Sequence, residues 1–308
     1  PTRAVVSAVA ERCAPTPADA AALATPLAGL QRPVAVFDAG IGSYAIVQRL
    51  QQRFPWLDLI YFADRASFPY GGKSREVLAP LIEATVARLG TWGASAVVLA
   101  SNAPSVMVLE GLQAAGLPVP VRGVFPPVRE ALAASRSGVV VVMGVASLAS
   151  SPQIQAYIRR EADGRPVAVE NASAMVELVE NGSFLSQPQA TQTAVDAFMA
   201  ELLRRHPGAD VCTLSSTHLP WLQPFFERAA PQVRFLDPAD SVVAELEAFI
   251  GAASQRAPGH VGQVLCVATE SPDQPLSGLS DMLGRLGVAL TPILVQPTVV
   301  GQPLGDKS

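Results

Sequence analysis

Two short polar segments, Ser101–Ala103 and Ser216–His218, carry the residues of this chain that are best placed for chemistry. Each one closes an apolar run, Ala96–Ala100 in the first case and Val211–Ser215 in the second. Runs of this kind are typical of buried strands, and parallel α/β sheets present their chemistry at the carboxyl ends of such strands. Two strand ends, one in each half of the chain, predict two half-sites that face each other across a cleft.

Two further segments belong to the same prediction. Asp38 ends another apolar run, and the loop Pro69–Ser74 contains adjacent glycines before a predicted helix. Glycine lets a ligand approach the backbone closely, and N–H groups around Tyr70 and Gly71 can bind a carboxylate. We therefore expect this loop and Asp38 to line the cleft.

One of the three histidines and one cysteine bear on the site. His218 lies at the second strand end, whereas His206 and His260 are predicted to lie on the surface. Cys212 precedes Ser216 by four residues on the same strand, so it points to the same face about 13 Å deeper in the sheet. A cysteine buried among apolar groups is inert, so Cys212 cannot supply a nucleophile at the strand end.

The elements that must position these residues alternate between short β-branched strands and helices. The predicted strands are Val34–Asp38, Leu59–Asp64, Ala96–Ser101, Val119–Val124, Gly138–Gly144, Val167–Glu170, Val211–Ser215, Val233–Asp237 and Gln263–Ala268. Predicted helices include Ser43–Arg53, Arg75–Trp92, Pro104–Ala115 and Pro188–Arg205. Such alternation indicates an α/β protein with mainly parallel sheets that helices cover on both faces.

The composition of the chain excludes several classes of function. The chain has 308 residues, enough for two domains, and only 16% of them are charged. A net charge of −4 offers no basic surface for nucleic acid, and the longest apolar run is too short to span a membrane. The Ala/Pro-rich first residues lack the pattern of a signal peptide, and three widely spaced cysteines suggest no disulfide framework or zinc site. We expect a cytoplasmic protein.

Together, these motifs resemble the glutamate racemase family of aspartate/glutamate racemases. That family reads Cys-Asn-Thr where this chain has Ser101–Ala103, and Gly-Cys-Thr-His where it has Ser215–His218. The segment Pro69–Ser74 resembles the family's Pro-Tyr-Gly-x-Lys-Ser loop. The resemblance covers roughly residues 32–296, and both cysteine positions of the family hold serine.

The resemblance implies two flavodoxin-like or Rossmann-like three-layer αβα domains with a ligand cleft between them. On this basis the first domain comprises residues 32–125 plus 236–296, and the second comprises residues 126–235. Residues 1–31 form an N-terminal extension and residues 297–308 form a tail.

The resemblance also implies a function and a set of site residues. The family interconverts L- and D-glutamate without a cofactor or metal and supplies precursors of bacterial peptidoglycan, so the expected ligand is an acidic amino acid and the expected assembly a homodimer. The cysteine positions are Ser101 and Ser216; Asp38 accompanies the first, and His218 paired with Glu180 accompanies the second. The implied substrate-binding positions are Ala39, Pro69, Tyr70, Gly71, Asn102, Ala103 and Thr217.

The two serines change the expected chemistry. Racemisation needs one group that removes the Cα proton and another that delivers a proton on the opposite face. The pKa of cysteine lies near 8.5, whereas a serine hydroxyl resembles water, whose pKa is about 15.7. This gap of roughly 7 units amounts to about 10 kcal/mol, so we predict a catalytically silent or very weak homologue, with a binding or regulatory role.

Further differences from the glutamate racemase motifs favour natural divergence of this sequence over an engineered pair of Cys→Ser substitutions. Ala39 and Ala103 stand where the family has a carboxylate-binding serine and threonine, and the loop Gly144–Leu148 lacks the threonines that usually follow its glycine.

Two alternatives stay open at this point. An active glutamate or aspartate racemase could use a different base, such as His218. The loop Gly40–Ala45 also satisfies a dinucleotide fingerprint, with Asp64 ending the next strand, which would make the protein an NAD-binding oxidoreductase.

Overall fold

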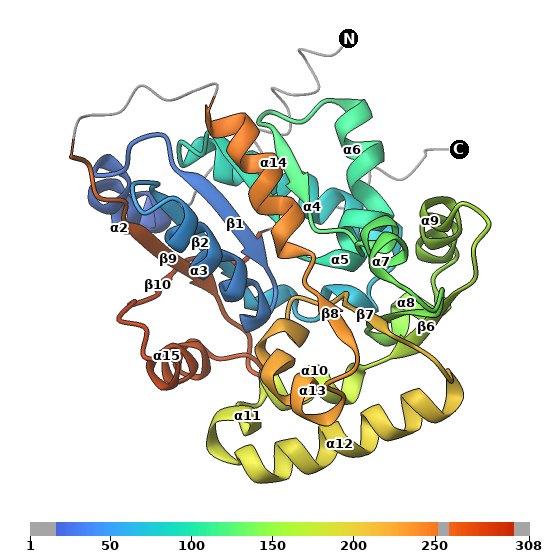
Figure 1. Cartoon of the computed structure of the whole chain (residues 1–308). Coiled ribbons are helices and arrows are strands. Elements are labelled where there is room, and N and C mark those ends of the chain that lie inside the picture. The colour runs from blue at the N-terminus through green and yellow to red at the C-terminus, as the bar shows by residue number, and fades with distance from the viewer. Residues whose placement is uncertain (1–16, 252–258, 299–308) are drawn as a thin grey trace, which may run out of the picture.

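The strands of the protein form two separate parallel sheets in a computed structural model that describes residues 17–251 and 259–298. The first sheet has six strands in the order β10-β9-β2-β1-β3-β4, and the second has four in the order β6-β5-β7-β8. The predicted α/β class with parallel sheets is confirmed (Figure 1).

Each predicted strand is present, with ends that differ from the prediction by no more than two residues. The strands are β1 (Val34–Asp38), β2 (Leu59–Asp64), β3 (Ala96–Leu99), β4 (Val121–Gly123), β5 (Val140–Gly144), β6 (Val167–Asn171), β7 (Val211–Leu214), β8 (Arg234–Leu236), β9 (Val264–Thr269) and β10 (Ile293–Leu294). The sequence analysis missed only β10 among the described strands, because two residues carry no readable pattern.

Helices and short helical turns connect these strands. The α-helices are α2 (Pro17–Ala28), α3 (Tyr44–Arg53), α4 (Arg75–Thr91), α5 (Asn102–Pro104), α6 (Glu110–Ala115), α7 (Val128–Ala134), α8 (Ala146–Ser150), α9 (Pro152–Ala162), α10 (Ser173–Glu180), α11 (Ser183–Ser186), α12 (Pro188–Arg205), α13 (Gln223–Ala229), α14 (Ala239–Gly251) and α15 (Leu276–Arg285). The 3₁₀ turns are η1 (Ile41–Ser43), η2 (Arg65–Ser67), η3 (Tyr70–Gly72) and η5 (Leu219–Leu222), and η4 (Ser105–Leu109) is a π-helical turn between α5 and α6.

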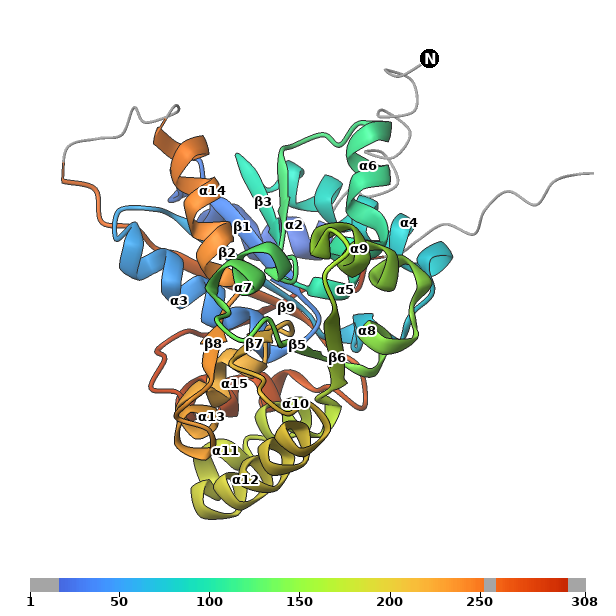
Figure 2. The same cartoon turned by 45° about the vertical axis from the view of Figure 1, so that its right-hand side comes forward.

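The central strand β1 is buried along its whole length because helices cover both faces of the first sheet. Val34 and Val36 face one core, and Ala35 and Phe37 face the other, as the period of two in a strand requires. Helix α4 packs on the second of these cores, whereas α3 and α14 pack on the first. The late elements α14 and β9 therefore lie with the N-terminal strands in both views (Figures 1 and 2), and β10 pairs with β9 at the edge of the same sheet.

One hydrophobic core continues from the first sheet into the second half of the molecule. It joins Val36 of β1 with Met143 of β5 and Val179 of α10, and all three side chains are buried. At Gly182, which has a φ of 75°, an added Cβ would lie 3.0 Å from the Met282 Cε atom of α15. This shared packing fixes the two sheets relative to each other, so that the carboxyl ends of β1 and β7 face each other.

The histidines and cysteines outside the strand ends have structural roles. His260 was expected to be exposed, but its side chain is 12% exposed and its Nε2 lies 2.9 Å from the carboxylate of the fully buried Asp58. His206 makes a comparable contact of 2.6 Å with Glu170. Burial raises the pKa of Cys212 to about 12, in line with the prediction that this thiol is inert.

Cys13 lies outside the described residues. No helix within the described ranges has the length and apolar character needed to cross a membrane.

Candidate functional site

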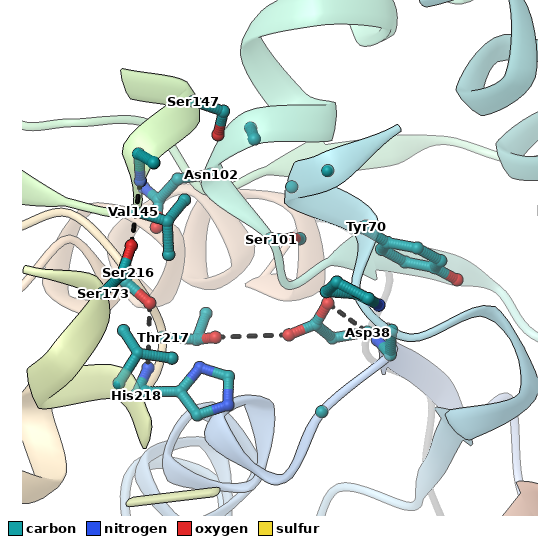
Figure 3. Close-up of a pocket in the computed structure, with 18 of the residues that line it drawn as sticks. Asp38, Tyr70, Ser101, Asn102, Val145, Ser147, Ser173, Ser216, Thr217 and His218 are labelled. Carbon is teal, nitrogen blue, oxygen red and sulfur yellow. Dashed lines mark hydrogen bonds between the residues drawn. The ribbon is translucent and has the colours of Figure 1, made fainter. Parts of the chain in front are cut away.

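A cavity of about 350 Å³ lies between the carboxyl ends of the two sheets, and residues of both halves line it (Figure 3). Almost every residue that the sequence analysis placed in the site lines this cavity: Asp38, Ala39, Pro69, Tyr70, Gly71, Ser101, Asn102, Ala103, Ser216, Thr217 and His218. Glu180 is not part of the lining and lies behind His218. The strand ends at Leu99 and Leu214 thus bring their two polar segments to one site.

Asp38 is the central ionisable group of this cavity. Its Oδ1 accepts a hydrogen bond of 2.7 Å from the Ala39 N–H, and its Oδ2 accepts one of 3.2 Å from the Thr217 hydroxyl across the cavity (Figure 3). Burial raises the pKa of Asp38 to about 6, although the charge of His218 and hydrogen bonds from Ala39, Ser101 and Thr217 act in the opposite direction. The carboxyl therefore titrates close to neutral pH.

This raised pKa predicts a pH-dependent gain in stability for Asp38→Asn. The stability contributed by the protonated carboxyl is fully present below pH 3.8 and is lost as the pH rises through about 6. The wild-type free energy of unfolding should therefore lose about 3 kcal/mol from this group between pH 4 and pH 7, a loss that the variant escapes. Urea unfolding of both proteins at several pH values measures the difference. If the difference between the two free energies of unfolding stays constant with pH, the raised pKa of Asp38 is contradicted.

His218 forms the second half of the site through an ion-pair network that joins the two sheets. Its Nε2 lies 2.8 Å from Oε2 of Glu180, whose Oε1 in turn lies 3.4 Å from an Arg65 guanidinium nitrogen at the end of β2. Burial opposes ionisation of Glu180, but the hydrogen bond and charge of His218 and the charge of Arg65 outweigh it and lower the Glu180 pKa. The imidazole is therefore held in one orientation by groups from both halves.

The glycines of the Gly40–Ala45 loop make room for this imidazole. A Cβ added at Gly40 would lie 2.8 Å from His218 Nε2, and one added at Gly42 would lie 2.6 Å from Nδ1. The histidine ring thus fills the space next to Gly40 and Gly42 into which a dinucleotide pyrophosphate would have to fit. The spacing that suggested an NAD site is explained by packing between the two halves.

We expect Gly42→Ala to destabilise the protein by about 1–3 kcal/mol, because the added methyl group must displace the His218 ring or the loop. Gly284→Ala in α15 is the matched control. A Cβ there has no neighbour within 4 Å, so the change should be neutral or stabilising by up to about 1 kcal/mol. Denaturant unfolding of both variants provides the comparison. Equal stabilities would show that the loop tolerates a side chain.

The loop from Pro69 to Gly71 is held in place from both sides of the cleft. The Tyr70 hydroxyl donates a hydrogen bond of 2.8 Å to the buried Asp64, which also accepts one of 3.0 Å from Thr269. A Cβ added at Gly71 would lie 3.3 Å from Val145 and 3.5 Å from the Ser147 hydroxyl, both from the second half. The loop and the segment after β5 therefore close one side of the cavity.

Two polar atoms of lining residues have no hydrogen-bond partner. The Asn102 side chain uses its Nδ2 to donate to the Val124 carbonyl at 3.2 Å, which leaves its buried Oδ1 unpaired. The buried Ser147 hydroxyl is also unpaired. Buried polar atoms are nearly always paired in proteins, so these two are candidates for contacts with a ligand.

Comparison with known proteins now decides the family. The protein-family model described as Asp/Glu/Hydantoin racemase matches residues 45–246. This chain belongs to that racemase family. Among curated racemases, the glutamate racemase of Ectopseudomonas mendocina is 32% identical over 222 residues, which cover 72% of this chain and 83% of that protein.

Two solved glutamate racemases share the fold. An isoform from Bacillus anthracis superimposes with a TM-score of 0.75 at 22% identity, covering 87% of this chain and 99% of that one. The Escherichia coli enzyme, solved with L-glutamate and the activator UDP-MurNAc-Ala, gives a TM-score of 0.72 at 23% identity and covers 88% and 100%. The racemase-like fold expected from the motifs is thereby confirmed.

The sequence analysis missed several residues of this racemase-family site. Arg65 follows from no local pattern, and Asp64 was noted only as part of the dinucleotide fingerprint, because their partners Glu180 and Tyr70 are identified only by the fold. Ser173, Val176 and Glu177 of α10 also line the cavity. Their only signal was the position of α10 directly after β6, at the same carboxyl edge as the other strand ends.

No group of three or more metal-ligating side chains was found within the described part of the chain. The lining of the cavity contains no cysteine, so any proton transfer at the site must use other groups.

Proposed function

We propose that this member of the racemase family binds a small α-amino acid between its two sheets without racemising it. The observation that carries the proposal is that Ser101 and Ser216 line one cavity at the two strand ends, and neither is paired with a histidine ring nitrogen that could activate it. In this proposal they occupy the cysteine positions of the glutamate racemases. Glutamate is the reference ligand, because the related Escherichia coli enzyme was solved with it.

The hydrogen bonds around each serine support catalytic silence. The Ser101 hydroxyl lowers the pKa of Asp38 by hydrogen bonding, so it donates its proton to a carboxylate that is already ionised above pH 6. The Ser216 oxygen accepts a hydrogen bond of 3.5 Å from the His218 backbone N–H, whereas the His218 Nε2 is bound to Glu180. Serine nucleophiles need an adjacent base that can take up the hydroxyl proton. The Asp38 carboxylate beside Ser101 has a pKa of about 6, far below that of a water-like hydroxyl, and the His218 Nε2 is bound to Glu180 rather than to Ser216.

A second candidate function is favoured by the pKa of Asp38. A carboxylate with a pKa of about 6 in a ligand-sized cavity suits a general base near neutral pH. Asp38 would remove the Cα proton and return a proton to the same carbanion, so that hydrogen exchanges with solvent while the two-base reaction stays absent. The role expected for His218 as an alternative base has less support, because its Nε2 is committed to Glu180.

The test combines binding with proton exchange. Calorimetric titration of the full chain with D-glutamate, L-glutamate and NAD measures binding, and the same samples in deuterated water report exchange at Cα. The proposal expects an amino acid to bind, NAD not to bind and the Cα proton to stay in place. If no amino acid binds to the protein, the proposal is wrong.

The domain boundaries and the homodimer are also proposals. Residues 32–125 with 236–296 contain the strands of the six-stranded sheet, and residues 126–235 contain those of the four-stranded sheet apart from Leu236, the last residue of β8, which supports the division to within one residue. Size-exclusion chromatography with light scattering would measure the oligomeric state.

A further inference from the structure

The charged side chains that line the cavity restrict the charge of a ligand that can bind there. Among the described lining residues, Asp38 and Glu177 carry carboxyl groups, no lysine or arginine is present, and the basic side chain of His218 is paired with Glu180. The nearby Arg65 is engaged by Glu180 and Gln274, and the exposed Lys73 does not line the cavity. A ligand with a positive charge is favoured here, and a second negative charge on the ligand is disfavoured.

The acceptors of the cavity suit an ammonium group. Asp38 is ionised above pH 6, and the Asn102 Oδ1 is buried without a donor. The Asn102 residue is 4% exposed, so its oxygen is not compensated by bulk water. The α-ammonium group of an amino acid would supply hydrogen-bond donors to both atoms and a charge opposite to that of Asp38.

The free hydroxyl donors suffice for one carboxylate. Ser101 and Thr217 already direct their hydroxyl protons to Asp38. Ser147 has no partner, and Ser216 accepts from the His218 N–H and so keeps its own proton to donate. Both remaining donors come from the second half of the molecule, so one α-carboxylate would engage them together.

The remaining side chains of the lining are mainly apolar, and the lining serines Ser173 and Ser215 are already hydrogen-bonded to Asn171 and Thr213. Ala39, Phe68, Ala103, Val145 and Leu148 line the cavity, and Leu148 is 1% exposed. A second carboxylate placed against these apolar side chains would lose its hydration, which is costly for a charged group. It would find no side-chain donor there and could bind only to backbone N–H groups such as those around Tyr70 and Gly71. A hydrocarbon or thioether side chain would instead gain from leaving water.

We propose that the cavity selects an α-amino acid with an uncharged, apolar side chain over an acidic one. This inference rests on the proposed amino-acid-binding function and names the ligand class for it. Asp38 and the Asn102 oxygen hold the ammonium group, Ser147 and Ser216 hold the carboxylate, and the apolar wall holds the side chain.

Three amino acids of similar length distinguish the effect of side-chain charge on binding from the effect of side-chain polarity. Calorimetric titration of the full chain with methionine, glutamine and glutamate, in both enantiomers, should rank them in that order. Glutamine and glutamate have nearly the same shape, so the neutral amide should bind about ten- to a hundredfold tighter, as expected for a charged group left without partners. Methionine should bind at least as tightly as glutamine.

Two variants test how much the exposed carboxylate of Glu177 on α10 weakens the binding of an acidic ligand. Glu177→Gln should tighten glutamate binding about threefold at low salt and less at high salt, and it should leave methionine affinity unchanged. Glu110→Gln, which removes an exposed carboxylate on α6 outside the cavity lining, should change neither.

The outcomes separate the two proposals. If glutamate binds more tightly than glutamine and methionine, the inference about ligand class is wrong, while the proposed amino-acid-binding function holds. If none of the three binds, the proposed function fails and the inference fails with it.

Discussion

In deuterated water, the protein is expected to leave the Cα proton of both glutamate enantiomers unexchanged over hours at enzyme concentrations at which an ordinary racemase equilibrates them. The reason is the proton affinity of the two serine hydroxyls that line the cavity. Their pKa lies roughly 7 units above that of cysteine, which corresponds to about 10 kcal/mol. No neighbouring base offsets this difference, because the Asp38 carboxylate that accepts from Ser101 has a pKa of only about 6 and the His218 Nε2 is bound to Glu180. Proton NMR of the Cα signal measures the exchange.

Two controls give this result its meaning. A cysteine-containing glutamate racemase in the same buffer must exchange the signal, and titration must show that the amino acid binds to this protein. Turnover within about a hundredfold of the control enzyme would contradict the prediction. Exchange that rises through pH 6 and disappears in Asp38→Asn would instead support the single-base function of Asp38.

Introducing cysteine at both strand ends should not produce normal racemisation. Ala39 and Ala103 line the cavity. By the motif resemblance described above, they stand where glutamate racemases direct hydroxyl groups at the substrate carboxylate. A hydrogen bond to a charged group is worth roughly 1.5–3 kcal/mol, so two such losses amount to about 3–6 kcal/mol, or a factor of hundreds to tens of thousands. We expect the double variant Ser101→Cys, Ser216→Cys to stay poor, and a quadruple variant that adds Ala39→Ser and Ala103→Thr to gain measurably. Rates of D- and L-glutamate interconversion, followed by circular dichroism, compare the two.

The single-cysteine variants are the matched controls for this series. Each should add one accessible thiol by titration with a thiol reagent and should remain unable to interconvert the enantiomers. If the double variant alone racemises glutamate at a normal rate, the cavity is intact for that substrate. The two serines would then be the only obstacle, and deliberate substitution would become the better explanation for them.

The sequence by itself determined the alternation of strands and helices and the segments at their ends. The strand patterns were readable because each strand, such as Val34–Asp38, is buried on both faces and is therefore apolar throughout. Parallel pairing then requires that all carboxyl ends lie at the same edge of a sheet. Ser101 and Ser216 could thus be assigned to two edges, and the motif resemblance assigned those edges to one cleft.

Only the tertiary structure decided how the groups at these edges interact. Thr217 and Asp38 are 179 positions apart in the sequence, and their hydrogen bond depends on the packing of one sheet against the other. The same packing buries Asp38, and burial is the main cause of its raised pKa. No local pattern of residues encodes a pKa that arises from the loss of surrounding water.

The glycine loop shows the same division between sequence and fold. Its spacing fits a dinucleotide fingerprint as well as a tight turn, because both need a backbone without side chains. The fold decides for the tight turn over the dinucleotide site, because the His218 ring lies against Gly40 and Gly42. Glu180, which is itself paired with Arg65, holds that ring in place. Residues from three distant segments meet there, and their meeting depends on the shared core that holds the two sheets together.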